Sequence, residues 1–564
     1  MALGVLLGVL CIVGANAIAP RVRVAAPLIL VAVGVAISLQ PWVHAGGAEV
    51  DPELILTGVL PLLLFAAAVS MPAVSFRRNF GAIAGLSVTL VVLTSFALGA
   101  LFDAVLPGLG LAGGVALGAV LSPTDAVATS IVKRLGVAPR VVSLLDGEAM
   151  LNDASALVVL RTALGAMAAA GGASIGTAVG KFALSVAIAS AIGVAVGFAT
   201  LVVRRRIRQA TVNTLLSFAV PLVAFKPADE AGASGLIAVV VAGLVIGQGA
   251  PRFLAAAHRA NERINWHTIE MLLEGGLFLL MGLQLVTLLS DDFDQLGLAI
   301  GLAAAAFGIA IAVRAVYVVP LVAGARRQQT RYEASRGKLE AMRDASAQTE
   351  DAKRALDDLE NAVVARIQKR VRRVLADADY GAQRPLGARD AVLLVWAGMR
   401  GAITLAAAET LPEEFPHREL LVLVAFLVAT GSVVLQGGTL GWIVRRLKFP
   451  APDAAVEARE RELFRGELEG VGLAVLDAPA TRDAYGDAVV AAMRERIVGA
   501  RDSERLELSG RLVDEVFDAQ RAHILDARRD GVYSTEARAA ALQRVDAMQL
   551  GFGISRRGSV GDSD

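Results

Sequence analysis

The amino-acid sequence predicts an all-α protein that crosses a membrane many times. Of its 564 residues, 55% are hydrophobic, and the mean hydropathy of +0.60 lies above the range of ordinary soluble domains. Apolar residues fill 1–325 and return at 388–445, whereas 326–387 and 446–564 are charged and rich in alanine. We therefore expect two membrane-spanning parts, a helical cytosolic insertion between them and a helical cytosolic tail.

Stretches of about 20 apolar residues are long enough to cross a bilayer. They predict about thirteen transmembrane helices, near 2–19, 24–43, 53–71, 80–104, 110–132, 141–169, 174–203, 211–225, 232–249, 265–290, 295–323, 388–411 and 419–443. Loops after the odd-numbered helices carry Arg and Lys, whereas loops after the even-numbered helices carry Asp and Glu or no charge. By the positive-inside rule, the N-terminus lies outside the plasma membrane and the C-terminus in the cytoplasm.

Two of these helices contain residues that interrupt a helix. The helix at 110–132 contains Pro123, which removes a backbone donor and disturbs the preceding turn. The helix at 388–411 contains Gly398 and Gly401. Single breaks of this kind often only kink or pack a helix. Here each break also carries a charge, and the two helices run in opposite directions, which is typical of inverted repeats with two crossed, unwound helices.

Charged residues also occur deep in three helices. At 1.5 Å per residue, Asp125, Asp153 and Arg400 fall near the middle of the bilayer. An ionisable group at that depth costs about 2.5–3.5 kcal/mol on insertion scales and usually has a function. An arginine there needs a carboxylate partner, and the candidates are Glu148 and Asp125.

Asp153 is the carboxylate best suited to exchange ions. Glu148 and Asn152 are four residues apart and share a helix face, while Asp153 is turned by about 100° from Asn152. One face can therefore hold an ion pair while Asp153 faces a cavity. Desolvation disfavours the charged form of a carboxylate, so such a group exchanges protons near physiological pH and a small cation displaces the proton. If Asp153 is the single exchanging group, one cation moves per proton and the cycle is electroneutral.

Five motifs of the chain resemble those of the bacterial sodium/proton exchangers of the monovalent cation:proton antiporter-1 family. The motifs are Ser122-Pro123-Thr124-Asp125, Glu148 with Asn152-Asp153, Leu60-Pro61-Leu62-Leu63-Leu64-Phe65, Glu274-Gly275-Gly276-Leu277-Phe278-Leu279-Leu280-Met281-Gly282-Leu283 and Gly398-Met399-Arg400-Gly401. They cover about residues 1–445, in the order that the family has. The resemblance implies a homodimer of thirteen-helix protomers, each with a dimerisation domain and a mobile six-helix core that works by elevator-like alternating access.

The resemblance also assigns roles by position. It makes Asp153 the carboxylate for cation and proton, Asn152 its companion, Thr124 a cation ligand through a backbone or hydroxyl oxygen, Asp125 a residue that holds the crossed chains, and Glu148 the partner of Arg400. No cofactor is implied besides the transported Na⁺ and H⁺.

Two positions depart from the family pattern. Relatives often have Glu after the Leu-Pro-x-Leu-Leu-Phe run and Ser directly after the Glu of the sixth helix, where this chain has Ala66 and Ala149. The set of cation ligands is therefore changed, and water, Ser122 or Ser155 are the candidate replacements. The transported cation stays open between Na⁺, Li⁺ and K⁺.

Further charged residues lie inside the predicted helices. Arg314 matches an arginine of relatives, and it either forms a core ion pair or extends its side chain toward the cytosol. Glu270 and Glu274 are four residues apart near the cytosolic entrance and are expected to line a solvated funnel. Arg161 and Lys181 lie toward the outer ends of their helices, where long side chains reach the membrane surface.

These observations favour a secondary active antiporter that exchanges Na⁺, or Li⁺, for H⁺ around Asp153. The alternatives are a K⁺/H⁺ antiporter of the same mechanism and, from another class, a gated cation channel. A net charge of +1 gives no support for nucleic-acid binding. The single Cys11 excludes a disulfide framework and a cysteine-based metal site. An intramembrane hydrolase would need a nucleophile and a base, and His267, at the entrance of a helix, is the one histidine of the predicted crossings.

Overall fold

In the computed structural model of the chain, the described residues are 2–22, 24–40, 51–71, 73–168, 175–207, 209–254, 256–291, 295–353, 386–449 and the single residues 473, 477, 483 and 487. The chain divides into two units, Met1–Ala451 and Pro452–Asp564. Most of the predicted cytosolic tail and the second half of the predicted insertion lie outside the described residues.

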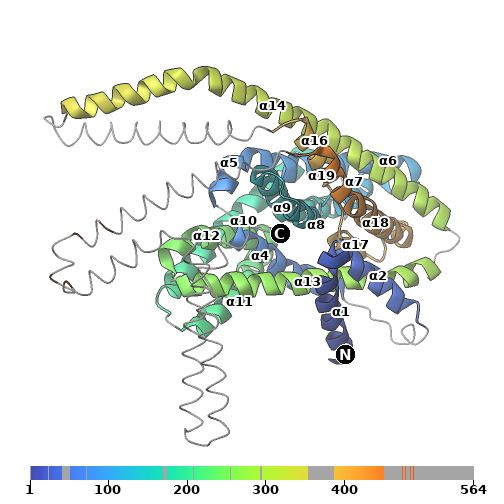
Figure 1. The fold of residues 1–564 in the computed structure, drawn as a ribbon. Helices are drawn as coiled ribbons and strands as arrows, with labels where there is room; N and C mark the ends of the chain where they lie inside the picture. The colour runs from blue at the N-terminus through green and yellow to red at the C-terminus, as the bar shows by residue number, and fades with distance from the viewer. Residues whose placement is uncertain are drawn as a thin grey trace, which may run out of the picture. The chain divides into compact units, whose positions relative to one another are not determined.

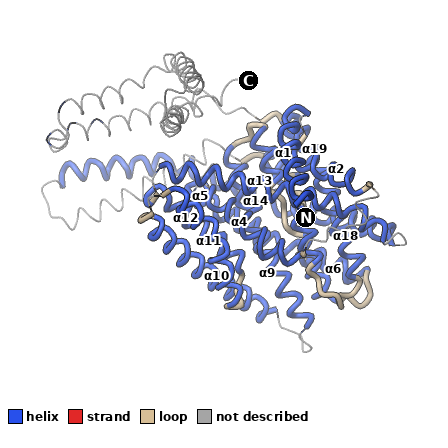
Figure 2. Tube along the Cα trace, turned by 90° about the horizontal axis from the view of Figure 1, so that it is seen from below, coloured by secondary structure: helices blue, strands red, loops and turns tan. Residues whose placement is uncertain are grey.

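All regular elements of the described residues are helical, as predicted (Figures 1 and 2). In chain order they are α1 (Ala2–Val22), α2 (Ala26–Ser38), α3 (Pro52–Leu54), a π-helical turn (Ile55–Val59), α4 (Leu60–Ser70), α5 (Ala73–Ala84), a second π-helical turn (Gly85–Thr89), α6 (Leu90–Val105), α7 (Gly110–Leu121), α8 (Val127–Arg134), α9 (Pro139–Ala168), α10 (Ile175–Arg204), α11 (Ala210–Glu230), α12 (Gly235–Phe253), α13 (Ala256–Asp291), α14 (Leu296–Lys353), α16 (Ala388–Trp396), α17 (Ala402–Glu409), α18 (Arg418–Ser432), a third π-helical turn (Val433–Gly437) and α19 (Gly438–Leu447).

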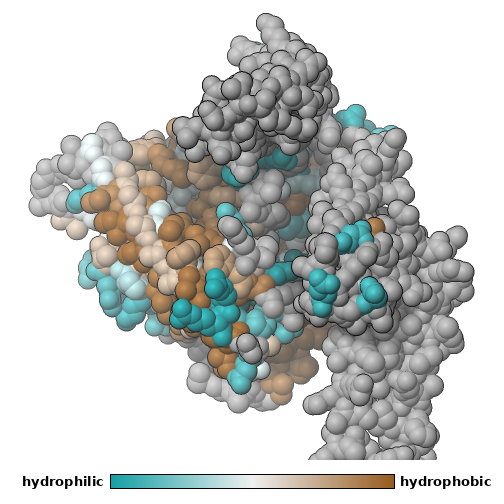
Figure 3. All heavy atoms as spheres, turned by 90° about the vertical axis from the view of Figure 1, so that its left-hand side faces the viewer, coloured by the Kyte–Doolittle hydropathy of each residue, from teal (hydrophilic) through white to brown (hydrophobic). Residues whose placement is uncertain are grey.

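The described helices have the length and surface of a membrane protein. Eight of them are long and apolar enough to cross a membrane, and three shorter apolar helices accompany them. The total of about thirteen crossings therefore stays a prediction. Large apolar side chains lie exposed on these helices, among them Leu184, Phe198, Leu215, Leu222 and Val316. Hydrophobic side chains cover much of the coloured part of the face shown in Figure 3. This fits contact with lipid, where a helix satisfies its own backbone groups.

The helices of the first unit pack as two groups. We call the first the α9 bundle; it consists of α5, α6, α7, α8, α9, α14, α16, α17, α18 and α19. The second, the α13 bundle, consists of α1, α2, α3, α4, α10, α11, α12 and α13. Small residues bring helices of one bundle close together, because a Cβ atom built at Gly34 of α2 would lie 2.8 Å from the Cα atom of Gly282 of α13.

Both predicted helix breaks are present, and they touch each other. Residues 122–126 separate α7 from α8, and residues 397–401 separate α16 from α17. The Asp125 N–H donates a 2.6 Å hydrogen bond to the Met399 carbonyl, which joins the two unwound segments. Four half-helices of the α9 bundle therefore end or begin at one place. Their relation as inverted repeats stays a prediction.

Candidate functional site

Asp125 lies at the start of two half-helices. Its Oδ1 atom accepts a 2.9 Å hydrogen bond from the Val127 N–H in the first turn of α8. Its carboxylate also lies against Gly401, the residue before α17, so closely that a Cβ atom at Gly401 would overlap it. Helix starts have unpaired N–H groups and favour negative charge. The carboxylate therefore stabilises the crossing through the starts of α8 and α17.

Arg400 has the complementary position, at helix ends. Its guanidinium donates hydrogen bonds to the carbonyls of Leu121 (3.2 Å), the last residue of α7, and Gly398 (2.5 Å), just after α16. Its backbone N–H and C=O both bond the Ser432 hydroxyl, at 2.8 and 2.9 Å. A cation is favourable beside the unpaired carbonyls of a helix end. Arg400 thus satisfies carbonyl groups, and in the described part of the chain no hydrogen bond or ion pair joins it to Glu148.

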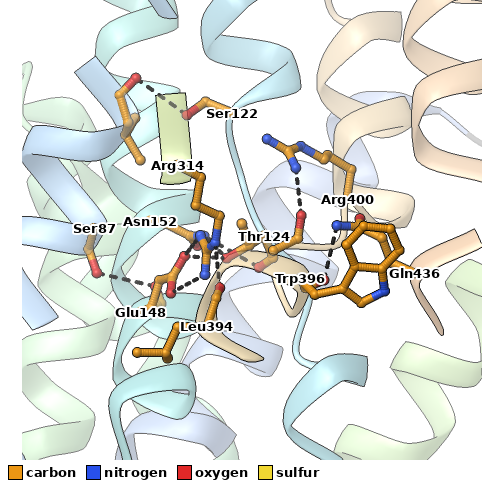
Figure 4. A network of polar contacts seen from close by, with 12 residues as sticks. Ser87, Ser122, Thr124, Glu148, Asn152, Arg314, Leu394, Trp396, Arg400 and Gln436 are labelled. Atoms are coloured by element: carbon orange, nitrogen blue, oxygen red, sulfur yellow. Dashed lines mark hydrogen bonds and ion pairs between the residues drawn. The ribbon is translucent and has the colours of Figure 1, made fainter. Parts of the chain in front are cut away.

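Glu148 pairs with Arg314 instead, which corrects the pairing with Arg400 expected from the sequence. Arg314 of α14 donates from both terminal nitrogens to the Glu148 carboxylate, with Nη2 at 2.8 Å from Oε2 (Figure 4). Its Nε donates to the Leu394 carbonyl at 2.7 Å. Both side chains are 2% exposed. The core ion pair is therefore the alternative that holds for Arg314, and the reason is that α14, not the unwound segment around Arg400, faces Glu148.

A chain of hydrogen bonds connects this pair to the unwound segment. The Thr124 hydroxyl donates to Glu148 Oε1 at 3.0 Å and accepts from the Asn152 amide at 2.6 Å. The Asn152 amide also lies 3.4 Å from the Thr124 carbonyl. Glu148 and Asn152 thus share one face of α9, as predicted, and this face holds Thr124 in place. The Asn152 Oδ1 atom is buried and has no hydrogen-bond partner among the described residues.

Small free space remains beside this chain of hydrogen bonds. A cavity of about 10 Å³ is bordered by Ser122, Thr124, Asn152, Arg314 and Arg400, among others. This is close to the smallest volume that holds one water molecule, and a water needs several polar partners. The cavity provides such partners, including the unpaired Asn152 Oδ1.

Asp153 differs from the other deep charges. It is 5% exposed on α9, and no hydrogen bond or ion pair to its carboxylate occurs in the described part of the chain. The carboxylate of Asp125 lies within electrostatic range of Asp153 and repels its charged form. A buried carboxylate without a partner is costly in its charged form. The position is suited to a proton or a cation.

The two alanines that replace polar residues of relatives are both buried. Ala66 is 1% and Ala149 is 9% exposed. The candidate replacements already use their protons, because Ser122 donates to the Val91 carbonyl at 3.3 Å and Ser155 bonds the preceding turn of α9 at 2.9 Å. Their oxygen lone pairs can still act as acceptors or ligands.

Acidic residues of both bundles lie near Asp125. Glu274 of α13 lies within electrostatic range of Asp125 and of Glu270, and Glu270 lies within range of Asp146. Asp146 was not predicted as a site residue, although its spacing of seven residues from Asp153 places both on one face of α9. Among the described residues, no group of three His, Cys, Asp or Glu side chains is arranged to hold a resident metal ion.

A buried ion pair in the α13 bundle was also not predicted from the sequence. Arg204, the last residue of α10, pairs with Glu262 of α13 at 2.7 Å, and the two side chains are 1% and 8% exposed. Asn213 accepts from Arg204 at 2.5 Å, and Ser217 donates to Glu262 at 2.9 Å. The sequence assigned Arg204 to a charged cytosolic loop. No local pattern distinguishes it from its exposed neighbours, because its burial depends on α11 and α13.

Comparisons with known proteins give matches over most of the chain. A family model described as "Sodium/hydrogen exchanger, transmembrane" matches residues 7–446. An uncharacterized Na⁺/H⁺ exchanger of Mycobacterium tuberculosis is 28% identical over 476 residues, which are 83% of this chain and 77% of that protein. The Na⁺/H⁺ antiporter NhaP of Pseudomonas aeruginosa is 27% identical over 403 residues, 70% of this chain and 81% of that protein. The structure of the sodium proton antiporter MjNhaP1 of Methanocaldococcus jannaschii matches with a TM-score of 0.55 at 15% identity, covering 79% of this chain and 97% of that one. This last similarity shows a shared fold.

Proposed function

We infer that this chain, which belongs to the sodium/hydrogen exchanger family, exchanges Na⁺ for H⁺ through one carboxylate, that of Asp153. The chain is a transmembrane antiporter of monovalent cations and protons, as its family membership indicates. We propose that the cation is Na⁺, that one cation moves per proton, and that Asp153 is the exchanging group.

One observation supports Asp153 above the other deep charges. Glu148 has Arg314 as its partner, Asp125 has the starts of two helices, and Arg400 has backbone carbonyls. These groups have compensating charge within the fold. Asp153 is buried and has none in the described part of the chain. Its missing counter-charge is what a transported proton or cation supplies.

The exchange follows from competition at this carboxylate. A proton on Asp153 leaves a neutral group that tolerates burial, and a cation that displaces the proton again leaves a neutral site. Each turnover then moves one cation one way and one proton the other way, which is electroneutral. Oxygen ligands for the cation come from the unwound segment, with the Thr124 carbonyl as our first candidate, because Asn152 contacts it only at 3.4 Å.

The two bundles supply the parts for alternating access. Asp153 belongs to the α9 bundle, as does Asp125, and Glu274 of the α13 bundle lies within electrostatic range of Asp125. We propose that the bundles move relative to each other and so expose Asp153 to either side of the plasma membrane. A homodimer, an outside N-terminus and a cytoplasmic C-terminus are part of the same proposal.

The alternative cation is K⁺. At Ala66 and Ala149 the chain has methyl groups in buried positions. A shell with fewer oxygen ligands favours an ion that loses its water at low cost, and K⁺ loses water more readily than Na⁺ or Li⁺. This observation makes K⁺/H⁺ exchange the second candidate.

The test is proton movement in proteoliposomes. A pH-sensitive dye reports dequenching after separate additions of Na⁺, Li⁺ and K⁺, with and without a clamped membrane potential. In the wild type, we expect cation addition to cause dequenching that does not depend on the membrane potential. In Asp153→Asn, we expect no dequenching. Asp103→Asn, the same change at an exposed carboxylate of α6, is the control and retains the dequenching. Exchange that survives Asp153→Asn assigns the proton to another group, and voltage-driven cation flux without proton movement indicates a channel.

A further inference from the structure

A second cavity lies between the bundles at their predicted outer ends. Its volume is about 290 Å³, roughly ten times the share of one water in the liquid. It is lined by residues of both bundles, including Arg161 of α9, Lys181 and Ser185 of α10, Phe225 of α11 and Leu236 of α12. Neither the ion pair of Glu148 nor the unwound segments border it.

The charged residues that line this cavity are both cations. One terminal nitrogen of Arg161 contacts Asp229 at 2.7 Å, and the side chain is still 60% exposed. A guanidinium has five N–H donors, so most of them remain available. Lys181 is exposed and has no hydrogen bond or ion pair within the described part of the chain. This lining repels a cation on its way to Asp153 and suits an anion.

The depth of the two cations points to a lipid. Lys181 follows the start of α10 by six residues, and Arg161 precedes the end of α9 by seven, which is about 10 Å along each helix. Cationic side chains at this depth lie near the boundary between headgroups and acyl chains. Leu184, on the same face of α10 as Lys181, is 61% exposed, so the rim of the cavity continues into the apolar surface of that helix.

Other residues that line the cavity are apolar. Phe225 and Leu236 line the cavity and are 7% and 5% exposed. A ligand that fills this space therefore needs an anionic group for Arg161 and Lys181 and a hydrocarbon part for these apolar residues. A small soluble anion provides only the first.

We propose that this cavity binds an anionic phospholipid, with its phosphate between Arg161 and Lys181 and the first part of an acyl chain against Phe225 and Leu236. Because the lining comes from both bundles, the lipid connects α9, which carries Asp153, to α10, α11 and α12. Such a ligand stabilises the arrangement of bundles in which the cavity has this shape. The proposal concerns binding and stands whether or not Asp153 is the exchanging carboxylate.

The experiment measures thermal unfolding of the full-length protein in a mild detergent. The probes are phosphatidylglycerol, phosphatidylcholine and glycerol 3-phosphate, each titrated separately. We expect phosphatidylglycerol to raise the Tm of the wild type with saturation, and the other two to leave it unchanged over the same range. Lys181→Gln removes one charge-assisted hydrogen bond, so the apparent Kd for phosphatidylglycerol is expected to weaken on the order of tenfold.

The control is Lys226→Gln, on α11. Lys226 is 78% exposed, forms a 3.9 Å ion pair with Glu230 and does not line the cavity. It loses the same charge and is expected to keep the wild-type Kd. Equal Kd values for Lys181→Gln and Lys226→Gln would overturn the proposal, as would equal shifts from phosphatidylcholine. A shift from glycerol 3-phosphate alone would replace the lipid by a soluble anion.

Discussion

The ion pair of Glu148 and Arg314 makes a quantitative prediction. Glu148→Gln keeps the size of the side chain and removes the charge that faces Arg314. Both side chains are 2% exposed, and Arg314 donates two hydrogen bonds to the carboxylate. Removing one partner of a buried pair leaves an uncompensated charge and costs about 3–5 kcal/mol. We expect Glu148→Gln and Arg314→Gln each to lower the free energy of unfolding by this amount.

The double variant, Glu148→Gln with Arg314→Gln, tests whether these two side chains interact. With both residues changed to glutamine no charge is left uncompensated, and two amides can bond each other. We expect the double variant to cost about as much as one single variant, so the coupling energy has the size of one single cost, about 3–5 kcal/mol. For Glu148→Gln combined with Arg400→Gln we expect a coupling below about 1 kcal/mol, because the Arg400 side chain bonds the carbonyls of Leu121 and Gly398.

The measurement is reversible unfolding in mixed detergent micelles, followed by circular dichroism for the wild type, three single variants and two double variants. At low denaturant, each variant must show the same circular dichroism as the wild type. If the larger coupling energy is found between Glu148 and Arg400, the pairing of Glu148 with Arg314 is wrong, and Glu148 pairs with Arg400 as the sequence predicted.

Three further predictions follow from the same structure. Gly401→Ala places a methyl group on the Asp125 carboxylate, and we expect it to cost about 1–3 kcal/mol in unfolding free energy and to slow exchange in proteoliposomes. Arg204→Gln leaves the buried Glu262 without its cation and is expected to cost about 3–5 kcal/mol, whereas Arg161→Gln breaks a pair that is 60% and 40% exposed and costs below about 1 kcal/mol. If a proton and Na⁺ compete for one carboxylate, the apparent KM for Na⁺ rises by up to about tenfold for each unit that the pH falls.

The Gly401→Ala variant has a matched control. Gly308→Ala of α14 adds a methyl group where no atom lies within 4 Å, so it should leave both unfolding and exchange unchanged. Equal effects at Gly308 and Gly401 would mean that helix propensity, not the contact with Asp125, sets the cost. An apparent KM for Na⁺ that does not change over several pH units would exclude a shared site for proton and cation.

The helix breaks were predictable because their cause is local. Pro123 cannot donate to the preceding turn, and the glycines around Met399 weaken the helix there, so both breaks occur at the residues that the sequence indicates. The two breaks meet through the 2.6 Å hydrogen bond from the Asp125 N–H to the Met399 carbonyl.

The partner of Glu148 was not predictable in the same way. Counting residues along a helix gives depth, and Arg400 does lie at a suitable depth. Depth does not give direction, however, and residue 400 lies in an unwound segment to which helical periodicity does not apply. The sequence placed Arg314 close to the cytosolic end of a crossing near residue 323, so an extended side chain was one alternative. Its buried position depends on contacts with Glu148 of α9 and the Leu394 carbonyl of α16, which lie far away along the chain.

The crossing of the unwound segments explains why two of the deep charges need no ion partner. The segment 122–126 leaves the carbonyls of α7 and the N–H groups of α8 unpaired, and the segment 397–401 does the same for α16 and α17. Arg400 donates hydrogen bonds to carbonyls at the C-terminal ends of α7 and α16. Asp125 lies at the N-terminal ends of α8 and α17. Their charges compensate fixed backbone dipoles, which do not change when an ion arrives. A charge that must change during transport therefore has to lie outside this arrangement, and Asp153, one turn along α9 from Ala149, is the deep carboxylate that meets this condition.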